Sequence, residues 1–365
     1  MKIISFINKT HWPFILMLIL ISSIGVALLY SIADGQWSPW ALRQIIRIVI
    51  GSIFLLIVTQ IHIQFWYRHA YQFYFFCIFL IFLTLLFSRE ISGAKRWLDL
   101  YFFTMQPAEI FKIIVILSLA KYFHSIKLQS YDIKQRILLP FLLLLIPVML
   151  VFKQPDLGTA LIIFISGIIV FFVSGIRIKT FFISGFVGII SFPLLWYFLK
   201  DYQKSRIINF LDQQNDLLGA NYHITQSKIA LGSGGFFGKG YLEGTQSHLQ
   251  FIPEMQTDFI FSVLGEEFGL LGIIVLFFLY IVLVLWSIKL SLESRNFFSK
   301  IFGISFISSF FLSVFVNVGM VTGIIPVVGV PLPLCSFGGS AMISFFIGFG
   351  ILLSGYNFRD YKVES

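Results

Sequence analysis

Long apolar runs alternate with short polar segments along the whole chain. A helix needs roughly 20 mainly apolar residues to cross the hydrocarbon core of a bilayer, so the sequence predicts about ten transmembrane spans. They lie near residues 13–32, 44–62, 70–88, 107–123, 137–152, 157–175, 180–199, 268–288, 301–322 and 340–356. The fifth and sixth are separated only by Lys153 to Asp156, so we expect them to form an antiparallel hairpin.

One connection is much longer than the others. Residues from about 200 to 258 join the seventh and eighth spans, and they keep many aromatic and aliphatic side chains. A loop of this length is usually functional or disordered, and its apolar content favours a folded loop. We expect a short amphipathic helix from Tyr222 to Leu231. No internal repeat is visible, so residues 1–365 are predicted to form a single domain.

The composition and charge agree with a lipid environment. The chain is 58% hydrophobic and 12% charged, whereas soluble domains have about 25% charged residues, which excludes a soluble enzyme. The net charge of +9 does not indicate nucleic acid, because Lys and Arg lie mainly in short segments between spans. With the N-terminus inside, about fourteen basic residues fall on the inner side and about five on short outer loops. Both termini are therefore predicted to be cytoplasmic, with the long loop outside.

Ionisable groups at membrane depth are costly, so each is a candidate functional group. Glu109 and Lys112 stand three residues apart, on one face of a predicted helix. One interpretation is an ion pair that locks two helices together. The other is that Lys112 faces an anionic headgroup while Glu109 holds it in place. The residues alone favour neither.

Several basic residues on the predicted outer side oppose the general charge bias. Arg43 and Arg47 lie one helical turn apart at the outer end of the second span, and Lys95 and Arg96 follow the third. Arg binds phosphate through a bidentate fork and Lys binds it as a point charge. Contact with lipid phosphate explains each residue equally well when it is taken singly.

Two aspartates each precede an apolar run. Asp156 opens the sixth span, where a carboxylate caps the helix and complements its dipole, and the spacing favours this structural role. Asp258 ends the long outer loop and is equally placed for an N-cap. Partial desolvation beside Phe259 and Phe261 would make it a stronger base, so capping and catalysis both stay open.

Two stretches of small residues carry no clear catalytic signal. Residues 232–240 are glycine-rich, but Ser233 and Gly240 break the nucleotide-binding pattern, so we expect tight turns or close backbone approach. Residues 329–340 are uncharged and contain two prolines. Such backbone is tolerated at membrane depth where protein or a water-filled cavity surrounds it. A passive re-entrant turn and a substrate-lining loop both fit.

Five of these stretches, in chain order, resemble the SEDS family of polytopic cell-wall polymerases. They are GAKRW at 93–97, QPAEIFK at 106–112, QPDLGT at 154–159, HLQFIPEMQTDFIF at 248–261 and GVPLPLCSFGGS at 329–340. GTQSH at 244–248 and QFIP at 250–253 are more similar to the RodA branch than to FtsW. Leu334 and Phe337 stand where the family pattern has Phe and Tyr, and both keep the hydrophobic character.

The resemblance implies an all-α integral membrane protein of about ten transmembrane helices, with a large extracytoplasmic loop between helices 7 and 8. It implies a multi-pass peptidoglycan glycosyltransferase in the bacterial cytoplasmic (inner) membrane, which polymerises lipid II at the outer face during elongation and rod-shape maintenance. The implied partner is the elongation-specific class B penicillin-binding transpeptidase. Asp258 matches the family's essential aspartate. Other important positions match Glu109, Lys112 and Asp156, and more loosely Lys95 and Arg96.

The chemistry implied by the resemblance is glycosyl transfer from undecaprenyl pyrophosphate. Asp258 would act as general base on the acceptor 4-hydroxyl, and cations would stabilise the departing pyrophosphate. The candidate cations are Arg43, Arg47, Lys95, Arg96 and Lys112. No cofactor is certain, a divalent cation (Mg²⁺ or Mn²⁺) could assist, and the sequence assigns no metal ligand. The alternatives are a lipid II flippase, which needs no base, and a non-catalytic scaffold of the elongation complex, which leaves the intramembrane charges unexplained.

Overall fold

We analysed a computed structural model of the chain. The structure describes residues 11–88, 96–99, 104–126, 137–182, 185, 197, 204, 220–248 and 254–363. Lys95 and most of the seventh predicted span, 180–199, lie outside the described residues.

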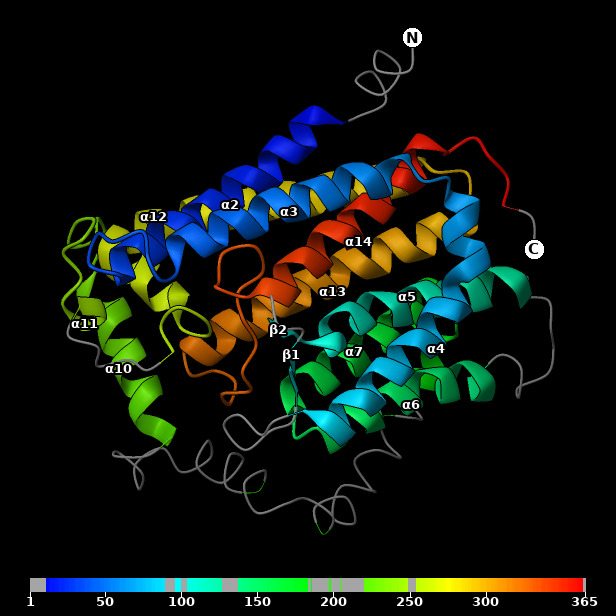
Figure 1. Cartoon of the computed structure of the whole chain (residues 1–365), viewed down its shortest axis with the longest axis horizontal. Coiled ribbons are helices and arrows are strands. Elements are labelled where there is room, and N and C mark those ends of the chain that lie inside the picture. The colour runs from blue at the N-terminus through cyan, green and yellow to red at the C-terminus, as the bar shows by residue number, and fades with distance from the viewer. Residues whose placement is uncertain are drawn as a thin grey trace.

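The described elements are almost all helices (Figure 1). They are α2 (Trp12–Ile32), α3 (Ala41–Gln60), α4 (Ile63–Phe87), α5 (Pro107–Ile126), α6 (Leu139–Lys153), α7 (Leu157–Val173), α10 (Ala220–Ser233), α11 (Thr245–His248), α12 (Ile260–Glu293), α13 (Phe297–Val321) and α14 (Gly339–Asn357). The exception is a pair of two-residue antiparallel strands, β1 (Leu98–Asp99) and β2 (Thr104–Met105), which the sequence analysis did not predict.

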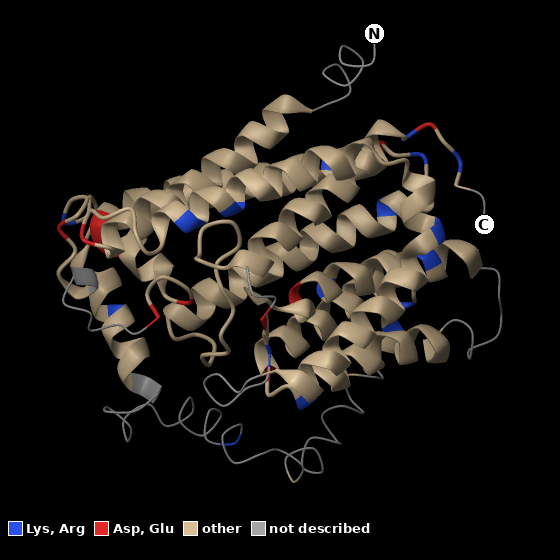
Figure 2. Ribbon diagram, in the orientation of Figure 1, with Lys and Arg blue, Asp and Glu red and all other residues tan. Residues whose placement is uncertain are grey.

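The helices have the length and composition of a membrane protein. Six of the described helices, α2, α3, α4, α12, α13 and α14, are long and apolar enough to cross a bilayer, and α6 and α7 are shorter apolar helices. Charged residues are sparse along the long helices (Figure 2). Large apolar side chains such as Val49, Phe79 and Phe278 are exposed on the outside of the bundle, where lipid would cover them. The chain is therefore an integral membrane protein built of helices.

Two helices form the centre of the bundle. In the most apolar stretch of each helix, 67% of the residues of α13 and 78% of those of α14 are buried. The same share is 28% in α3 and 22% in α12. Phenylalanine side chains fill this centre: Phe302, Phe306, Phe310, Phe346 and Phe349 are almost completely buried. Helices that are apolar on all sides and covered by other helices are typical of membrane bundles.

The glycine-rich stretch packs against a break in α12. Gly269 has a φ of 61° inside that helix, so the backbone groups around it need partners from elsewhere. The amides of Leu270 and Leu271 donate to the carbonyls of Gly235 and Phe236, at 3.0 and 3.1 Å. A Cβ on Gly238 would lie 2.0 Å from the Glu267 carbonyl oxygen. The predicted close backbone approach is confirmed, and only glycine permits it.

Several predicted boundaries shift in the structure. The hairpin of the fifth and sixth spans is confirmed as α6 and α7, and the short loop helix as α10. The third predicted span is α4, which begins at Ile63 rather than near residue 70, and α12 covers Ile260–Glu293 rather than 268–288. Both differences have one cause. Polar residues at the helix starts, such as Arg68 and Glu266, lower the local hydropathy although the chain is already helical there.

Candidate active site

The loop between α13 and α14 brings distant parts of the sequence together. The Gln44 side-chain amide of α3 donates to the Ser336 carbonyl at 2.9 Å. The Ser336 hydroxyl donates to the Thr257 carbonyl, and the Phe337 amide donates to the Gln256 carbonyl at 2.8 Å. Residues 329–340 therefore connect the first turn of α3 to the turn that precedes α12. The loop lies within the protein, in the middle of Figure 1.

Asp258 lies in that turn, one residue before the N-cap of α12. The N-cap position is held by Phe259, whose side chain makes no capping hydrogen bond, so the prediction that Asp258 occupies the N-cap position is wrong. The Asp258 carbonyl accepts a 2.9 Å hydrogen bond from the Asn317 amide, which also donates to Val330 at 2.7 Å. Asp258 is half-buried, and its Oδ2 would lie 3.6 Å from a Cβ on Gly329. Backbone contacts thus fix the turn.

Asp156 has the predicted capping role and a second set of contacts. Its Oδ1 accepts from the Thr159 amide at 3.3 Å, which confirms the N-cap. Its Oδ2 accepts from the Gln106 side-chain amide at 2.8 Å, and Arg96 lies 3.8 Å from Oδ1. The Gln106 backbone amide donates to the Ser340 hydroxyl at 2.9 Å. One polar network therefore joins residues from four of the five sequence stretches, at the start of α14.

Glu109 and Lys112 form a buried ion pair in α5. Lys112 Nζ lies 2.8 Å from Glu109 Oε2, and the side chains of Lys112 and Glu109 are only 8% and 6% exposed. Lys112 Nζ also lies 5.4 Å from the ring centroid of Phe345 in α14. The predicted pairing is confirmed, and the pair joins α5 to the central helix.

Arg47 reaches the same loop from α3. Its guanidinium carbon lies 3.9 Å from the Phe337 ring centroid, a cation–π contact, and the group lies beside Gly339. Arg47 Nη1 is buried and has no hydrogen-bond partner among the described residues. Arg43, one turn earlier, is exposed. Sequence reasoning proposed both arginines, but it missed Gln44 and Gln106, whose amide side chains carry no charge to mark them.

Glu266 and Glu267, which lie close to Asp258 in the sequence, belong to a separate cluster. Both are almost completely buried. Glu266 Oε1 accepts hydrogen bonds from Lys239 Nζ and from the backbone amide of Gln246, each at 2.8 Å. Glu267 accepts from Ser31 of α2. These carboxylates hold the segment of Lys239 and Gln246 against α12, and α12 against α2.

Comparison with known proteins agrees with this arrangement. The model of a family described as cell cycle protein, FtsW/RodA/SpoVE, matches residues 4–360. The chain belongs to this FtsW/RodA/SpoVE family. The chain is 41% identical to the peptidoglycan glycosyltransferase MrdB of Escherichia coli, with 98% of each chain covered.

Solved structures show the same fold. A chain from a study of the structural coordination of polymerization and crosslinking by a peptidoglycan synthase complex superposes with a TM-score of 0.81, at 29% identity over 95% of this chain and 98% of that one. The rod shape determining protein RodA of Thermus thermophilus gives a TM-score of 0.72 at 27% identity, over 95% and 97%. The helical FtsW/RodA/SpoVE fold is therefore shared over 95% of the chain, and the resemblance to the RodA branch is confirmed.

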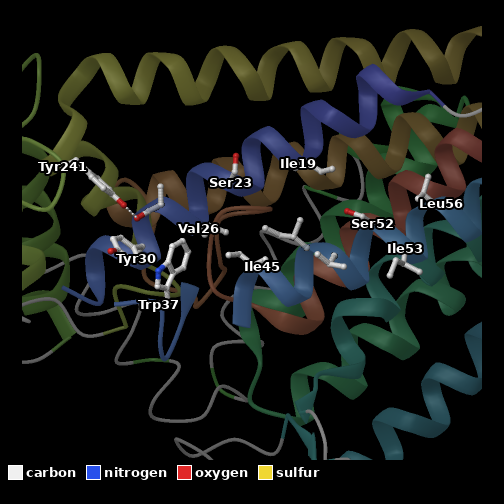
Figure 3. Close-up of a pocket in the computed structure, with 13 residues that line it drawn as sticks. Ile19, Ser23, Val26, Tyr30, Trp37, Ile45, Ser52, Ile53, Leu56 and Tyr241 are labelled. Atoms are coloured by element: carbon white, nitrogen blue, oxygen red, sulfur yellow. Dashed lines mark hydrogen bonds between the residues drawn. The ribbon is translucent and has the colours of Figure 1, made fainter. Parts of the chain in front are cut away.

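An apolar groove of this FtsW/RodA/SpoVE chain lies away from these polar residues. It has a volume of about 840 Å³ and lies between α2 and α3 (Figure 3). Tyr30, Trp37 and Tyr241 close one end, where the Tyr241 hydroxyl donates to the Ala27 carbonyl at 2.9 Å. The described lining residues include no Lys, Arg, Asp, Glu or His. This lining therefore offers no carboxylate to act as a base and no cation for a pyrophosphate, whereas the residues around the loop at 329–340 offer both.

The described residues do not fit a resident metal ion. No three His, Cys, Asp or Glu side chains among them gather into a ligand set. Asp156 and Glu109 already contact Arg96 and Lys112. Cys77 and Cys335 are free and buried, as their apolar surroundings indicate.

Proposed function

We propose that this protein is a peptidoglycan glycosyltransferase that polymerises lipid II into glycan strands at the outer face of the cytoplasmic membrane. Such an enzyme serves elongation and rod-shape maintenance. The observation that carries the proposal is the loop at 329–340, which joins the turn of Asp258 to Arg47 and to the network of Asp156. A base and several cations gathered around one loop fit transfer from a pyrophosphate carrier.

The reaction breaks the bond between the sugar C1 of the growing strand and its undecaprenyl pyrophosphate. The acceptor 4-hydroxyl of lipid II forms the new glycosidic bond, and its proton passes to the Asp258 carboxylate, the general base. The pyrophosphate leaves with the bonding electron pair. Asp258 suits this role because its side chain is half-buried while backbone contacts hold its turn in place.

The leaving pyrophosphate needs positive charge, since fixed cations stabilise charge that develops in the transition state. Arg47 is the strongest candidate, because Nη1 is buried without a partner among the described residues. Lys112 and Arg96 are the next candidates, because each forms an ion pair with a carboxylate that holds the cation in position. Arg43 and Lys95 complete the proposed set. A divalent cation, Mg²⁺ or Mn²⁺, would enter with the pyrophosphate, because Mg²⁺ is usually bound by substrate phosphates and only a few protein ligands.

The finer topology is part of the same proposal. It comprises a single domain of about ten transmembrane helices, a large extracytoplasmic loop between helices 7 and 8, and both termini in the cytoplasm. Contacts of His11, at the start of α2, with Tyr356, near the end of α14, support termini on the same side. The partner is a class B penicillin-binding transpeptidase, which the likeness to a chain of a peptidoglycan synthase complex supports.

Glycan polymerisation from labelled lipid II tests the proposal. The purified protein with its transpeptidase partner is expected to make long strands without ATP, because the pyrophosphate linkage supplies the driving force. A complex that is folded and binds lipid II but makes no strand would contradict the enzyme. In that case a flippase or a scaffold of the elongation complex would take its place, and lipid II movement across vesicles would separate these two.

A further inference from the structure

Helix α10 packs against α12 and α13 beside the turn that carries Asp258. The Ser227 hydroxyl lies 2.7 Å from the Ser262 hydroxyl of α12 and donates to the Val321 carbonyl of α13 at 2.8 Å. One turn later, Leu231 packs on Gly265, where a Cβ would lie 2.4 Å from Leu231 Cδ2. The two helices therefore run side by side from the first turn of α12.

This packing places a histidine beside the turn of Asp258. His223 stands four residues before Ser227, as Asp258 stands four residues before Ser262. The His223 ring contacts the ring of Phe259, the residue after Asp258, with 6.4 Å between the centroids. An imidazole on α10 thus lies beside the turn that carries the proposed base.

Nδ1 of His223 lacks a hydrogen-bond partner among the described residues. Nδ1 is shut off from solvent, whereas the ring as a whole is partly exposed. Burial lowers the pKa of His223, so the imidazole is neutral near pH 7 and offers one donor and one acceptor. A polar group that folding leaves without a partner needs an explanation. If His223 only packed against the ring of Phe259, phenylalanine would fill the same position equally well.

We propose that His223 binds a hydroxyl group of the acceptor sugar through Nε2 and orients it toward Asp258. This inference rests on the function proposed above. The base and its substrate contact would then come from two helices that the serine pair holds together. The contact is made in the bound state and in the transition state alike, so it should affect KM more than kcat.

Two variants separate this role from packing. His223→Phe keeps a ring against Phe259 and removes both nitrogens, whereas His223→Gln restores a polar group near the position of Nε2. Loss of one neutral hydrogen bond predicts about a tenfold rise in the KM for lipid II in His223→Phe, with kcat within about twofold. His223→Gln should recover most of the loss, and His69→Phe, the same change on α4, should have no effect. Melting temperatures in detergent report folding.

Lipid II binding measured without turnover keeps the inference separate from the general base. In an Asp258→Asn background, adding His223→Phe should weaken lipid II binding about tenfold. Unchanged binding would overturn the inference while leaving Asp258 intact as the base. Equal losses in His223→Phe and His223→Gln with lowered melting temperatures would also overturn it, in favour of packing. An active Asp258→Asn enzyme would instead reject the general base, and the binding measurement would still decide the role of His223.

Discussion

Separate replacement of the two charges in α5 distinguishes a structural ion pair from a substrate contact. At 2.8 Å and an effective dielectric constant of about 20, two unit charges attract by about 6 kcal/mol, and breaking a buried pair typically costs about 3–5 kcal/mol. Lys112→Met leaves Glu109 buried and uncompensated, and Glu109→Leu does the same to Lys112. Each single variant should therefore lose about 3–5 kcal/mol of unfolding free energy.

The double variant Glu109→Leu/Lys112→Met gives the decisive comparison. It removes both charges and fills the space with apolar groups of similar volume, a change that is often neutral or stabilising. SDS unfolding in mixed micelles should therefore place its stability near that of the wild type. Glycan polymerisation should nevertheless be abolished, because the variant has no lysine at position 112 to face the pyrophosphate. A stable double variant that polymerises normally would refute the substrate role, and a double variant as unstable as the singles would refute the electrostatic argument.

Three further predictions use the same assays. Both Asp156→Ala and Asp156→Asn remove the charge that faces Arg96 and should reduce polymerisation. Asp156→Ala also removes the α7 cap, which Asp156→Asn keeps, and should therefore be less stable than Asp156→Asn by about 1 kcal/mol of unfolding free energy; equal stability of the two would contradict the capping role. Gly158→Ala places a Cβ 2.3 Å from the Val328 carbonyl oxygen, and this overpacking should cost about 1–3 kcal/mol of unfolding free energy. Gly232→Ala, the control, has open space around its Cβ and should leave the unfolding free energy unchanged. EDTA should stop polymerisation without lowering the melting temperature, and a lowered melting temperature would reveal a resident metal.

Hydropathy and loop length were enough to predict the architecture of the described part. The α6–α7 hairpin and α10 follow directly from apolar runs and from the short segment between Lys153 and Asp156. Helix starts were less predictable. Glu266 and Glu267 fell before the predicted span 268–288, because hydropathy cannot show that Lys239 pairs with Glu266 and that Ser31 donates a hydrogen bond to Glu267 inside the helix.

The candidate site was predictable only where charge marked it. Glu109 and Lys112 were recognisable as a pair because helical spacing fixes their separation. The contacts of Gln44 and Gln106 with Ser336 and Ser340 span more than two hundred residues, so no local pattern shows them. The spacing of Asp258 suggested a helix cap, and only the backbone of its turn shows that Phe259 takes the cap position instead.

The most direct test of the account compares Asp258→Asn with Glu254→Gln in a lipid II polymerisation assay with the transpeptidase partner. Both changes remove one carboxylate charge from the same turn, but Glu254 is exposed and pairs with Gln256 and Thr257. The account predicts that Asp258→Asn makes no glycan strands while staying folded, partner-bound and able to bind lipid II, and that Glu254→Gln polymerises like the wild type. Polymerisation by Asp258→Asn at the wild-type rate would contradict the assignment of Asp258 as the general base.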